Sequence, residues 1–434
     1  MHHSIREWEH LSVDNPADQN SITRASADRL LSIARTTSLG GDEGERILLN
    51  GVKKLRAQQV VGVLTAEGVS LEILPKIDGA SDDGATRRSL IHMLAAVLDL
   101  EVASGAVTDL DWQKDNLLEI LIRLFCTKLF EAVHRGLPRR YVGHQEDLGT
   151  LKGRLDVRRQ FTTLASSPQK LACQYDELSS DIPLNQLMKA VVLRLAKLSR
   201  APENQRMLRE LSFVFAEVGK VPRAVLSPQN ILIDRTNSSW KELLKLAQML
   251  LGERYQTTTS GGGRGFSLLF EMNTLFEEFV GRSLRRALVG TDLHVHLQGP
   301  MDHALVDHLS GKARFATRPD IVISRNGSPV MVIDTKWKRL KGEIDDPKRG
   351  VGQADIYQMM AYAHVYRCEQ LMLLYPHHRG SGVTDGVIQV HRITNKPTSR
   401  VSIATLLLSN PKSVVPRLRE MCLNTIHLSR DETQ

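Results

Sequence analysis

Cysteine is scarce in this sequence, and the cysteines that occur form no pattern. Cys126, Cys173, Cys368 and Cys422 lie far apart, with no CxxC pair among them. That spacing excludes a zinc ribbon built on cysteine pairs and gives no support for a disulfide framework. A chain with few cysteines and no bridge pattern fits the reducing cytoplasm best.

Long apolar runs are missing too. The sequence contains no stretch of roughly 18 apolar residues, so it predicts no membrane-spanning helix. Its first ten residues, MHHSIREWEH, lack the apolar core of a signal peptide, and secretion through such a signal is not expected. Internal repeats, heptads and low-complexity tracts are absent as well.

The charge excess is small for 434 residues. Lys and Arg number 57 against 49 Asp and Glu, which leaves a net charge of +8. This balance permits a nucleic-acid partner, but it equally fits a surface kept soluble by charge. Hydrophobic residues make up 41% and charged residues 24%, close to the average of soluble globular proteins. Extended disorder is therefore excluded as the main state.

The length predicts two to four domains at roughly 100–200 residues each. The expected secondary structure changes twice along the chain. Residues 1–85 are strand-rich, whereas residues 86–258 are mainly helical with a basic, strand-like insert at 139–160. The TTTSGGGRG segment at 257–265 is the strongest linker signal and introduces a third block, 264–434. Its triple glycine lacks the GK[ST] ending of a phosphate loop, so a flexible linker is favoured. We expect a multi-domain α+β protein.

Periodicity predicts most of the elements in these blocks. Alternation at 69–75 predicts a half-buried strand, and 77–87 reads as a loop. Further strands are expected at 46–52, 60–65, 293–297, 317–324, 329–336 and 370–376. Helices are expected at 26–36, 90–98, 117–134, 184–198, 240–251, 270–288 and 352–366.

Two of these strands form a predicted hairpin that carries carboxylates. Asn326-Gly327 is a turn signal between them. A two-residue loop would place residue 319 opposite Asp334, whereas a three-residue or bulged loop would place Asp320 there. Both arrangements bring Asp320 and Asp334 close together, in the second case on one face. Because side chains alternate along a strand, Lys336 points to the same side as Asp334.

Adjacent carboxylates repel each other unless a cation lies between them. Mg²⁺ prefers oxygen ligands and commonly binds one or two carboxylates plus waters. Lys336 could stabilise a phosphoryl transition state or orient the attacking water, and Glu277 from the preceding helix could complete the metal shell. This combination predicts metal-assisted phosphodiester hydrolysis.

The spacing resembles a known nuclease signature. Pro319-Asp320, thirteen intervening residues and Asp334-Thr335-Lys336 are similar to the PD-(D/E)XK motif. The helix glutamate lies upstream and Gln358-x-x-x-Tyr362 lies downstream, in the order that this motif leads one to expect. The alternative is an ordinary surface hairpin ending in Asp and Lys.

Further blocks resemble McrC, the nuclease subunit of McrBC modification-dependent restriction systems. The similarity runs from about residue 45 to 380 and consists of VSLEILPK (69–76), GLPRRYV (136–142), DLGTLKGRLD (147–156), DIPLNQ (181–186) and MNTLFEEFV (272–280). The resemblance implies an N-terminal partner-binding module and a C-terminal PD-(D/E)XK nuclease domain with a mixed sheet flanked by helices. It also implies a AAA+ GTPase hexamer, McrB-like, as partner, whose NTPase is stimulated. The implied substrate is modified double-stranded DNA, and the implied cofactor is Mg²⁺, with Mn²⁺ as a substitute.

The same resemblance assigns roles to individual residues. The catalytic residues would be Asp320, Asp334, Lys336 and Glu277, and the metal ligands among them Asp320, Asp334 and Glu277, with Glu278 adjacent to the last. A supporting role near the site falls to Gln358 and Tyr362. A phosphate backbone would lie directly after the site, and we therefore expect DNA contact from Lys338, Arg339 and Lys341.

Several features of the sequence allow two interpretations. The basic clusters Arg139-Arg140 and 152–159 could contact DNA phosphates or a partner, or be solvated surface. His294 and His296 share a strand face, but an ordinary strand position is favoured over metal ligation. Packing is favoured for Trp337. Two rival functions are an autonomous DNA-repair nuclease and a non-catalytic adaptor that stimulates a AAA+ motor.

Overall fold

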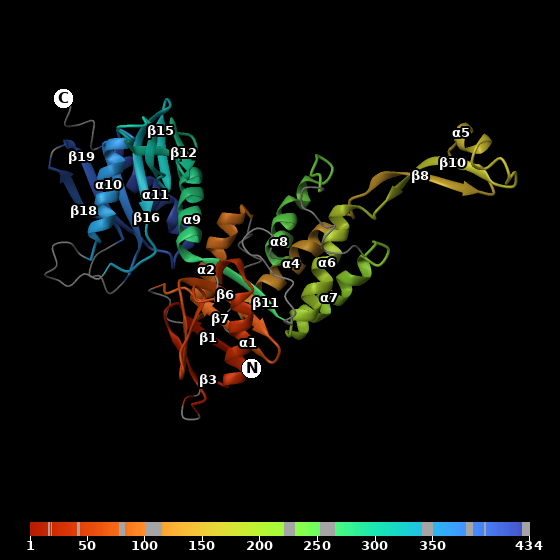
Figure 1. Ribbon diagram of the computed structural model, residues 1–434, viewed down its shortest axis with the longest axis horizontal. Coiled ribbons are helices and arrows are strands. Elements are labelled where there is room, and N and C mark those ends of the chain that lie inside the picture. The colour runs from red at the N-terminus through yellow and green to blue at the C-terminus, as the bar shows by residue number, and fades with distance from the viewer. Residues whose placement is uncertain are drawn as a thin grey trace. The chain divides into compact units, whose positions relative to one another are not determined.

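The structure is a computed structural model that describes eleven stretches of the chain. These are residues 1–15, 18, 20–40, 44–77, 83–100, 115–220, 231–251, 265–340, 350–378, 385–394 and 396–427. The chain forms two compact units, one made of Met1–Leu117 with Tyr255–Gln434 and the other of Leu118–Arg254 (Figure 1). The three-block division drawn from the sequence stays a prediction.

The first unit contains a sheet that combines strands from both of its chain segments. Its strand order is β1 (His2–Arg6), β7 (Val69–Leu74), β6 (Val60–Ala66) and β11 (Phe266–Glu271). Strand β11, which follows the predicted linker, pairs antiparallel with β6 and places Leu269 opposite Gly62. A Cβ at Gly62 would lie 1.9 Å from the carbonyl oxygen of Leu268, so only glycine permits this close approach.

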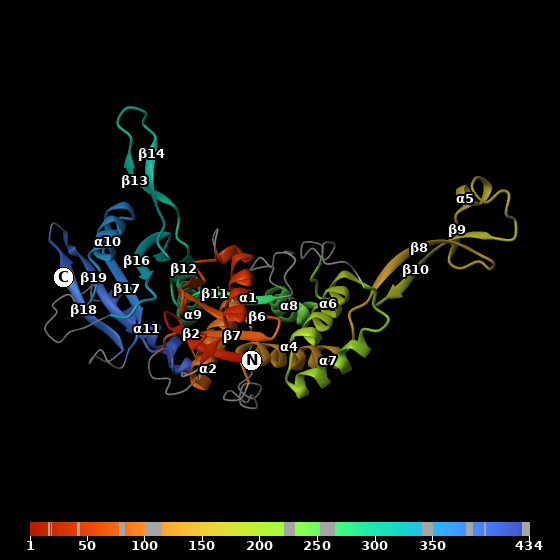
Figure 2. The ribbon, with the colours of Figure 1, turned by 60° about the horizontal axis from the view of Figure 1, so that its bottom comes forward.

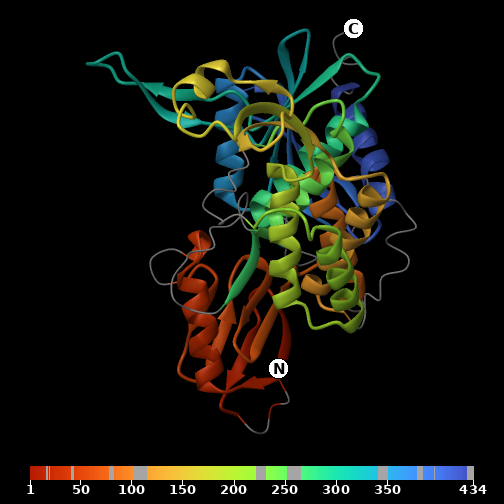
Figure 3. The ribbon, with the colours of Figure 1, turned by 90° about the vertical axis from the view of Figure 1, so that its right-hand side faces the viewer.

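A smaller sheet and one helix complete the N-terminal module. The sheet has the order β3 (Ser21–Ile22), β2 (His10–Val13), β5 (Lys54–Ala57) and β4 (Leu48–Asn50), and η1 spans Ser38–Gly40. Helix α1 (Arg24–Arg35) begins after Thr23, whose hydroxyl accepts a hydrogen bond from the Ser26 N–H. Its apolar face packs on β6 and β7 (Figure 3). The helix predicted at 26–36 and the strands predicted near 46–52 and 60–65 are confirmed.

The prediction that strand 69–75 is half-buried is wrong. Every residue of β7 is buried, because the helices α1 and α2 (Asp83–Leu98) both pack against this strand. Its polar position Glu72 faces the interior, where the carboxylate forms an ion pair with Arg87 at 2.6 Å and accepts from the Leu117 N–H at 2.7 Å. Burial raises the pKa of Glu72, but the His2 imidazole, together with these two partners, holds it at about 2. The alternation therefore marks a buried ion pair rather than a solvent face.

Arg87 belongs to helix α2 (Asp83–Leu98). The loop predicted at 77–87 therefore ends earlier than expected, and residues 78–82 lie outside the described residues. The apolar helix predicted at 90–98 is confirmed.

The second unit combines helices with a small sheet. Its helices are α4 (Leu117–His134), α6 (Pro183–Leu198), α7 (Pro202–Val214) and α8 (Lys241–Leu251), preceded by η4 (Ser238–Trp240). The sheet has the order β8 (Arg140–Leu148), β10 (Leu171–Ser179) and β9 (Arg154–Leu155), with α5 (Val157–Phe161) beside it. The strands β8 and β10 extend away from the helices of this unit (Figure 2). The strand-like insert is thus longer than predicted, because β10 lies where helix was expected.

The rest of the first unit contains a six-stranded mixed sheet. The strand order is β12 (Leu293–Leu297), β15 (Ile321–Arg325), β16 (Ser328–Thr335), β17 (Gln370–Pro376), β19 (Lys396–Leu406) and β18 (Gly386–Ile393). Strands β16, β17 and β19 pair in parallel. The pairs β12–β15, β15–β16 and β18–β19 are antiparallel. Helix α10 (Gln353–Val365) packs on β17, while α9 (Met272–Ala287) and α11 (Pro411–His427) pack on each other.

A hairpin of β13 (Asp302–Val306) and β14 (Ala313–Thr317) precedes β15; the sequence pattern did not predict it. The predicted α+β class is confirmed, with several sheets and a mixed sheet next to helices. Among the helices of the described residues, none is long and apolar enough to cross a membrane.

Candidate active site

A β-bulge decides which residue lies opposite Asp334. Asn326 and Gly327 form the two-residue turn, both with positive φ (51° and 80°), as a type I′ turn requires. Next to the turn Ser324 pairs with Pro329, but from Ile323 onward the register shifts by one, so that Ile321 pairs with Ile333. Extension of this register by one residue places Asp320 opposite Asp334. The bulged alternative predicted from the sequence is therefore the one that occurs.

Proline gives a physical reason for the bulge. Pro329 has no N–H to donate to the ladder, and prolines within sheets are confined to edges, strand starts and bulges. Since the side-chain period of a strand is two, the one-residue shift changes the face on which the paired residues meet. The bulge thus brings two carboxylates together on one side of the hairpin.

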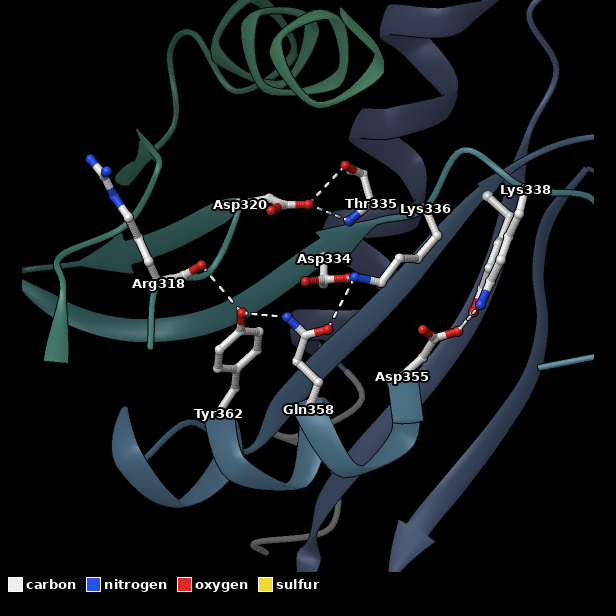
Figure 4. Close-up of polar contacts among 10 residues, drawn as sticks. Arg318, Asp320, Asp334, Thr335, Lys336, Lys338, Asp355, Gln358 and Tyr362 are labelled. Carbon is white, nitrogen blue, oxygen red and sulfur yellow. Dashed lines mark hydrogen bonds and ion pairs between the residues drawn. The ribbon is translucent and has the colours of Figure 1, made fainter. Parts of the chain in front are cut away.

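Asp320 is held by the strand that carries its partner. Its Oδ2 accepts from the backbone N–H of Thr335 at 2.7 Å and from the Thr335 hydroxyl at 2.8 Å (Figure 4). Its carbonyl oxygen accepts from the Gln298 N–H at 2.6 Å. These contacts leave Oδ1 as the carboxylate oxygen of Asp320 that can take a further ligand.

Asp334 is completely buried at the end of β16. Lys336 Nζ lies 2.6 Å from its Oδ2 in an ion pair, whereas its Oδ1 has no hydrogen-bond partner within the described part of the chain. Burial, and then repulsion from Asp320, raise the pKa of Asp334 to about 6, although Lys336 opposes the shift. A buried carboxylate with so few partners fits a site that receives a cation.

A chain of hydrogen bonds fixes the ammonium group of Lys336. Its Nζ donates to Gln358 Oε1 at 3.0 Å, Gln358 Nε2 donates to the Tyr362 hydroxyl at 2.7 Å, and that hydroxyl donates to the Arg318 carbonyl oxygen at 3.2 Å (Figure 4). Gln358 and Tyr362 lie four residues apart on α10 and therefore share one face of the helix. Burial raises the pKa of Tyr362, so its hydroxyl stays a proton donor. The structure thus brings both residues into contact with the predicted site.

The structure also separates the roles of the two adjacent glutamates on α9. Glu278 lies 3.6 Å from Arg282 in an ion pair one turn along the helix. Glu277 is half-buried, and its pKa is raised to about 7 by burial, then by the charges of Asp320, Glu278 and Asp334. Glu277 therefore shares the electrostatic environment of the two aspartates.

The donor set at this site is carboxylate oxygen throughout, which suits a hard divalent cation. Within the ranges that the structure describes, no three His, Cys, Asp or Glu side chains are arranged as a ready metal site. In this conformation Asp320 and Asp334 can supply two protein ligands, while Glu277 contributes negative charge. Mg²⁺ is usually bound in this way, by one or two carboxylates with the remaining positions filled by water.

The predicted DNA-binding residues follow the site directly. Lys338 and Arg339 are exposed, and the ammonium group of Lys338 forms an ion pair with Asp355 of α10. Lys341 lies outside the described residues. Trp337 packs, as expected: it is 6% exposed and meets Phe276 edge-on, with ring centres 5.4 Å apart.

Sequence reasoning missed the residues of the N-terminal module that contact this segment. Glu7 Oε1 accepts from Trp337 Nε1 at 2.8 Å and from the Lys76 N–H at 2.8 Å. Gln59 Nε2 donates to the Trp337 carbonyl oxygen at 3.2 Å and to Asn273 Oδ1 at 3.0 Å. Glu7 and Trp337 are 330 residues apart, and no local pattern links them.

The other features with two readings also have defined surroundings. His296 Nε2 and the Ser324 hydroxyl lie 2.9 Å apart, which suits an ordinary strand histidine. In the basic insert of the second unit, Arg159 pairs with Asp147 at 2.6 Å and Lys152 with Glu177 at 3.1 Å. Some of this positive charge is thus neutralised within the unit itself.

Comparison with known proteins identifies the family. The model of the McrBC 5-methylcytosine restriction system component matches residues 55–376. No curated protein shows significant sequence similarity to the chain.

Solved structures also have a similar fold. One chain of the refined half-complex from the tetradecameric assembly of Thermococcus gammatolerans McrB AAA+ hexamers with bound McrC is similar over 98% of this chain and 100% of that one, with a TM-score of 0.77 and 18% identity. One chain of the cryo-EM structure of the Thermococcus gammatolerans McrBC complex is similar over 67% of this chain and 88% of that one, with a TM-score of 0.55 and 22% identity. The resemblance stated from the sequence blocks is confirmed. Since the family match spans well over half of its residues, the chain belongs to the McrBC 5-methylcytosine restriction system component family.

Proposed function

We propose that the chain is the DNA endonuclease subunit of a McrBC-like restriction complex that hydrolyses phosphodiester bonds of modified double-stranded DNA. The observation that carries this proposal is the opposed pair Asp320 and Asp334, with a buried carboxylate short of hydrogen bonds and a lysine beside it. An ordinary surface hairpin has no reason to bury a carboxylate opposite a second one, because Lys336 compensates only part of the cost and the pKa of Asp334 stays raised. The PD-(D/E)XK arrangement gives that group a function.

The residues of the chain divide the work. Asp320 and Asp334 would hold Mg²⁺, or Mn²⁺ in its place, with the charge of Glu277 close by. The metal supplies Lewis acidity at the scissile phosphate when it is bound. Lys336 presents its ammonium group where negative charge develops on the phosphate, and Gln358 and Tyr362 hold that group in place.

The partner belongs to the same proposal. The solved relatives contain McrB AAA+ hexamers and McrC, and we extend that arrangement to this chain. The partner is then a AAA+ GTPase hexamer whose NTPase activity the chain stimulates. The complex acts in the cytoplasm, where the four buried, unbridged cysteines stay reduced.

The test is cleavage of methylated plasmid with Mg²⁺ by the full chain, alone and with the AAA+ protein encoded beside it, in GTP or ATP. We expect cleavage only with partner and nucleotide. Asp334→Asn is expected to abolish cutting and to leave stimulation of the NTPase intact.

The other outcomes are informative. Cutting by the chain alone would favour an autonomous nuclease. Stimulated NTP hydrolysis without cutting in any condition would favour a non-catalytic adaptor. If Asp334→Asn removed stimulation together with cutting, the two activities would not be separable as proposed.

A further inference from the structure

A cavity of about 660 Å³ adjoins the candidate site, within the range of roughly 300–1,000 Å³ that is usual for ligand sites. The N-terminal module contributes part of its wall, including Trp8, Gln59 and Lys76. The segment after β16 contributes another part, from Lys336 to Arg339. Lys336 therefore borders both the candidate site and this cavity.

Direct hydrogen bonds hold the two walls together. The buried carboxylate of Glu7 accepts from the Trp337 indole and from the backbone N–H of Lys76. Gln59 bridges the Trp337 carbonyl oxygen and Asn273 on α9. Because both contacts involve Trp337, the N-terminal module fixes the position of the residue that follows Lys336.

The charge lining the cavity is mainly positive. Four cationic side chains line it, namely Lys76, Lys336, Lys338 and Arg339. The one carboxylate in its lining, Glu7, is 1% exposed and is turned to the internal hydrogen bonds just described. Asp355 neutralises part of the charge of Lys338. Asp334 likewise pairs with Lys336 at 2.6 Å. On the wall that the N-terminal module contributes, the cation is Lys76.

Lysine side chains at this position suit phosphate groups. Lysines bind phosphates as point charges, and contacts of this kind fix the register of a protein on DNA without reading its sequence. Trp8 lines the cavity and is 42% exposed. The Arg56 guanidinium lies over its ring, 5.6 Å from the ring centre, and the opposite face could stack on a base or sugar.

We propose that this cavity binds the phosphate backbone of the DNA strand next to the scissile bond, with Lys76 as the contribution of the N-terminal module. The inference rests on the proposed nuclease function and assigns part of its substrate binding to a module outside the mixed sheet.

The test measures binding separately from cleavage. The affinity of the full chain for a fluorescent duplex is determined in EDTA over a range of salt concentrations. We expect Lys76→Ala to weaken binding several-fold and to reduce the slope of log K against log salt by about 1, the loss of one phosphate contact. Lys76→Arg should restore both values, which a merely structural role of the lysine would not predict.

A matched control separates this effect from general loss of charge. Lys54→Ala removes an exposed lysine from β5 of the same module, outside the cavity lining, and should leave the salt slope unchanged. The backbone N–H of Lys76 that bonds to Glu7 is kept in every variant, so the melting temperatures should agree.

Equal salt slopes for Lys76→Ala and Lys54→Ala, in a chain that binds and cuts DNA, would overturn the cavity assignment alone. A wild-type chain that neither binds DNA nor cuts it with its partner would overturn the proposed function and this inference together.

Discussion

Replacement of Asp334 by asparagine should abolish cleavage and at the same time stabilise the metal-free chain at neutral pH. The carboxylate is fully buried, lies opposite Asp320 and has Lys336 as its charged neighbour. Asn keeps the shape of the side chain and removes the charge. The expected gain in stability is the cost of keeping this group ionised.

The pKa of Asp334 gives the size of that cost. It is raised from 3.8 to about 6 by burial and by Asp320. One pKa unit corresponds to about 1.4 kcal/mol, so the ionised carboxylate costs about 3 kcal/mol of folding free energy at pH 8. The cost is absent well below pH 3.8, grows as the pH rises from 3.8 to about 6, and is constant above that range. The advantage of Asp334→Asn should therefore be about 0.5 kcal/mol near pH 4 and reach about 3 kcal/mol above pH 7.

Thermal unfolding of the full chain in EDTA at pH 4.5 and pH 8 measures this difference. We expect Asp334→Asn to melt several degrees above wild type at pH 8 and only about a third as far above it at pH 4.5. Added Mg²⁺ should raise the melting temperature of wild type and not of the variant, since a ligand stabilises only the state that binds it. Asp302→Asn, at an exposed position on β13, serves as the control with no expected difference between the two pH values.

The reasoning would be refuted by a variant that is less stable than wild type at pH 8. It would be refuted equally by a difference in melting temperature that does not change between pH 4.5 and pH 8, since the effect is ascribed to ionisation alone.

Four further outcomes follow from the same structure. Gln358→Ala removes the acceptor that positions the site lysine, so cleavage should fall roughly 10–100-fold while DNA binding in EDTA is unchanged; equal cleavage rates would contradict the positioning role. Glu72→Gln should destabilise the chain by about 3 kcal/mol at pH 7, because its pKa of about 2 contributes stability above 4.5 that is lost as the pH falls towards 2, and the difference from wild type in urea unfolding should shrink over that interval. Arg87→Lys keeps a charge at that pair and should cost less than Glu72→Gln. Gly62→Ala should lower the melting temperature by several degrees, since its Cβ would collide with the backbone of β11; a neutral effect would argue against that strand pairing.

Much of the site could be predicted from the sequence because its functional residues lie at short, fixed spacings. The interval from Asp320 to Asp334 and the four-residue step from Gln358 to Tyr362 follow from strand and helix periods alone. Asp334 lies on a strand and Gln358 and Tyr362 lie on a helix, as predicted, whereas Asp320 immediately precedes β15 rather than lying on it. The sequence allows either residue 319 or Asp320 to lie opposite Asp334, because a β-bulge depends on how one strand pairs with its neighbour.

Burial misled the prediction where polar residues face the interior. The alternation at Glu72 looks like a half-exposed strand, and only the packing of α1 and α2 against β7 shows that both faces are covered. Arg87, which neutralises the carboxylate, lies on α2, and the sequence pattern placed the start of this helix several residues too late.

The sequence by itself determined the family, the α+β class and the candidate catalytic set, because these depend on residue types at short, fixed intervals. Tertiary structure alone decided that β11 joins the sheet of the first residues, and that Glu7 and Gln59 hold the segment after Lys336. Such contacts join residues that are hundreds of positions apart. The local periodicity of a segment does not encode its distant partner, because the pairing depends on burying surfaces and satisfying hydrogen-bonding groups in the whole fold.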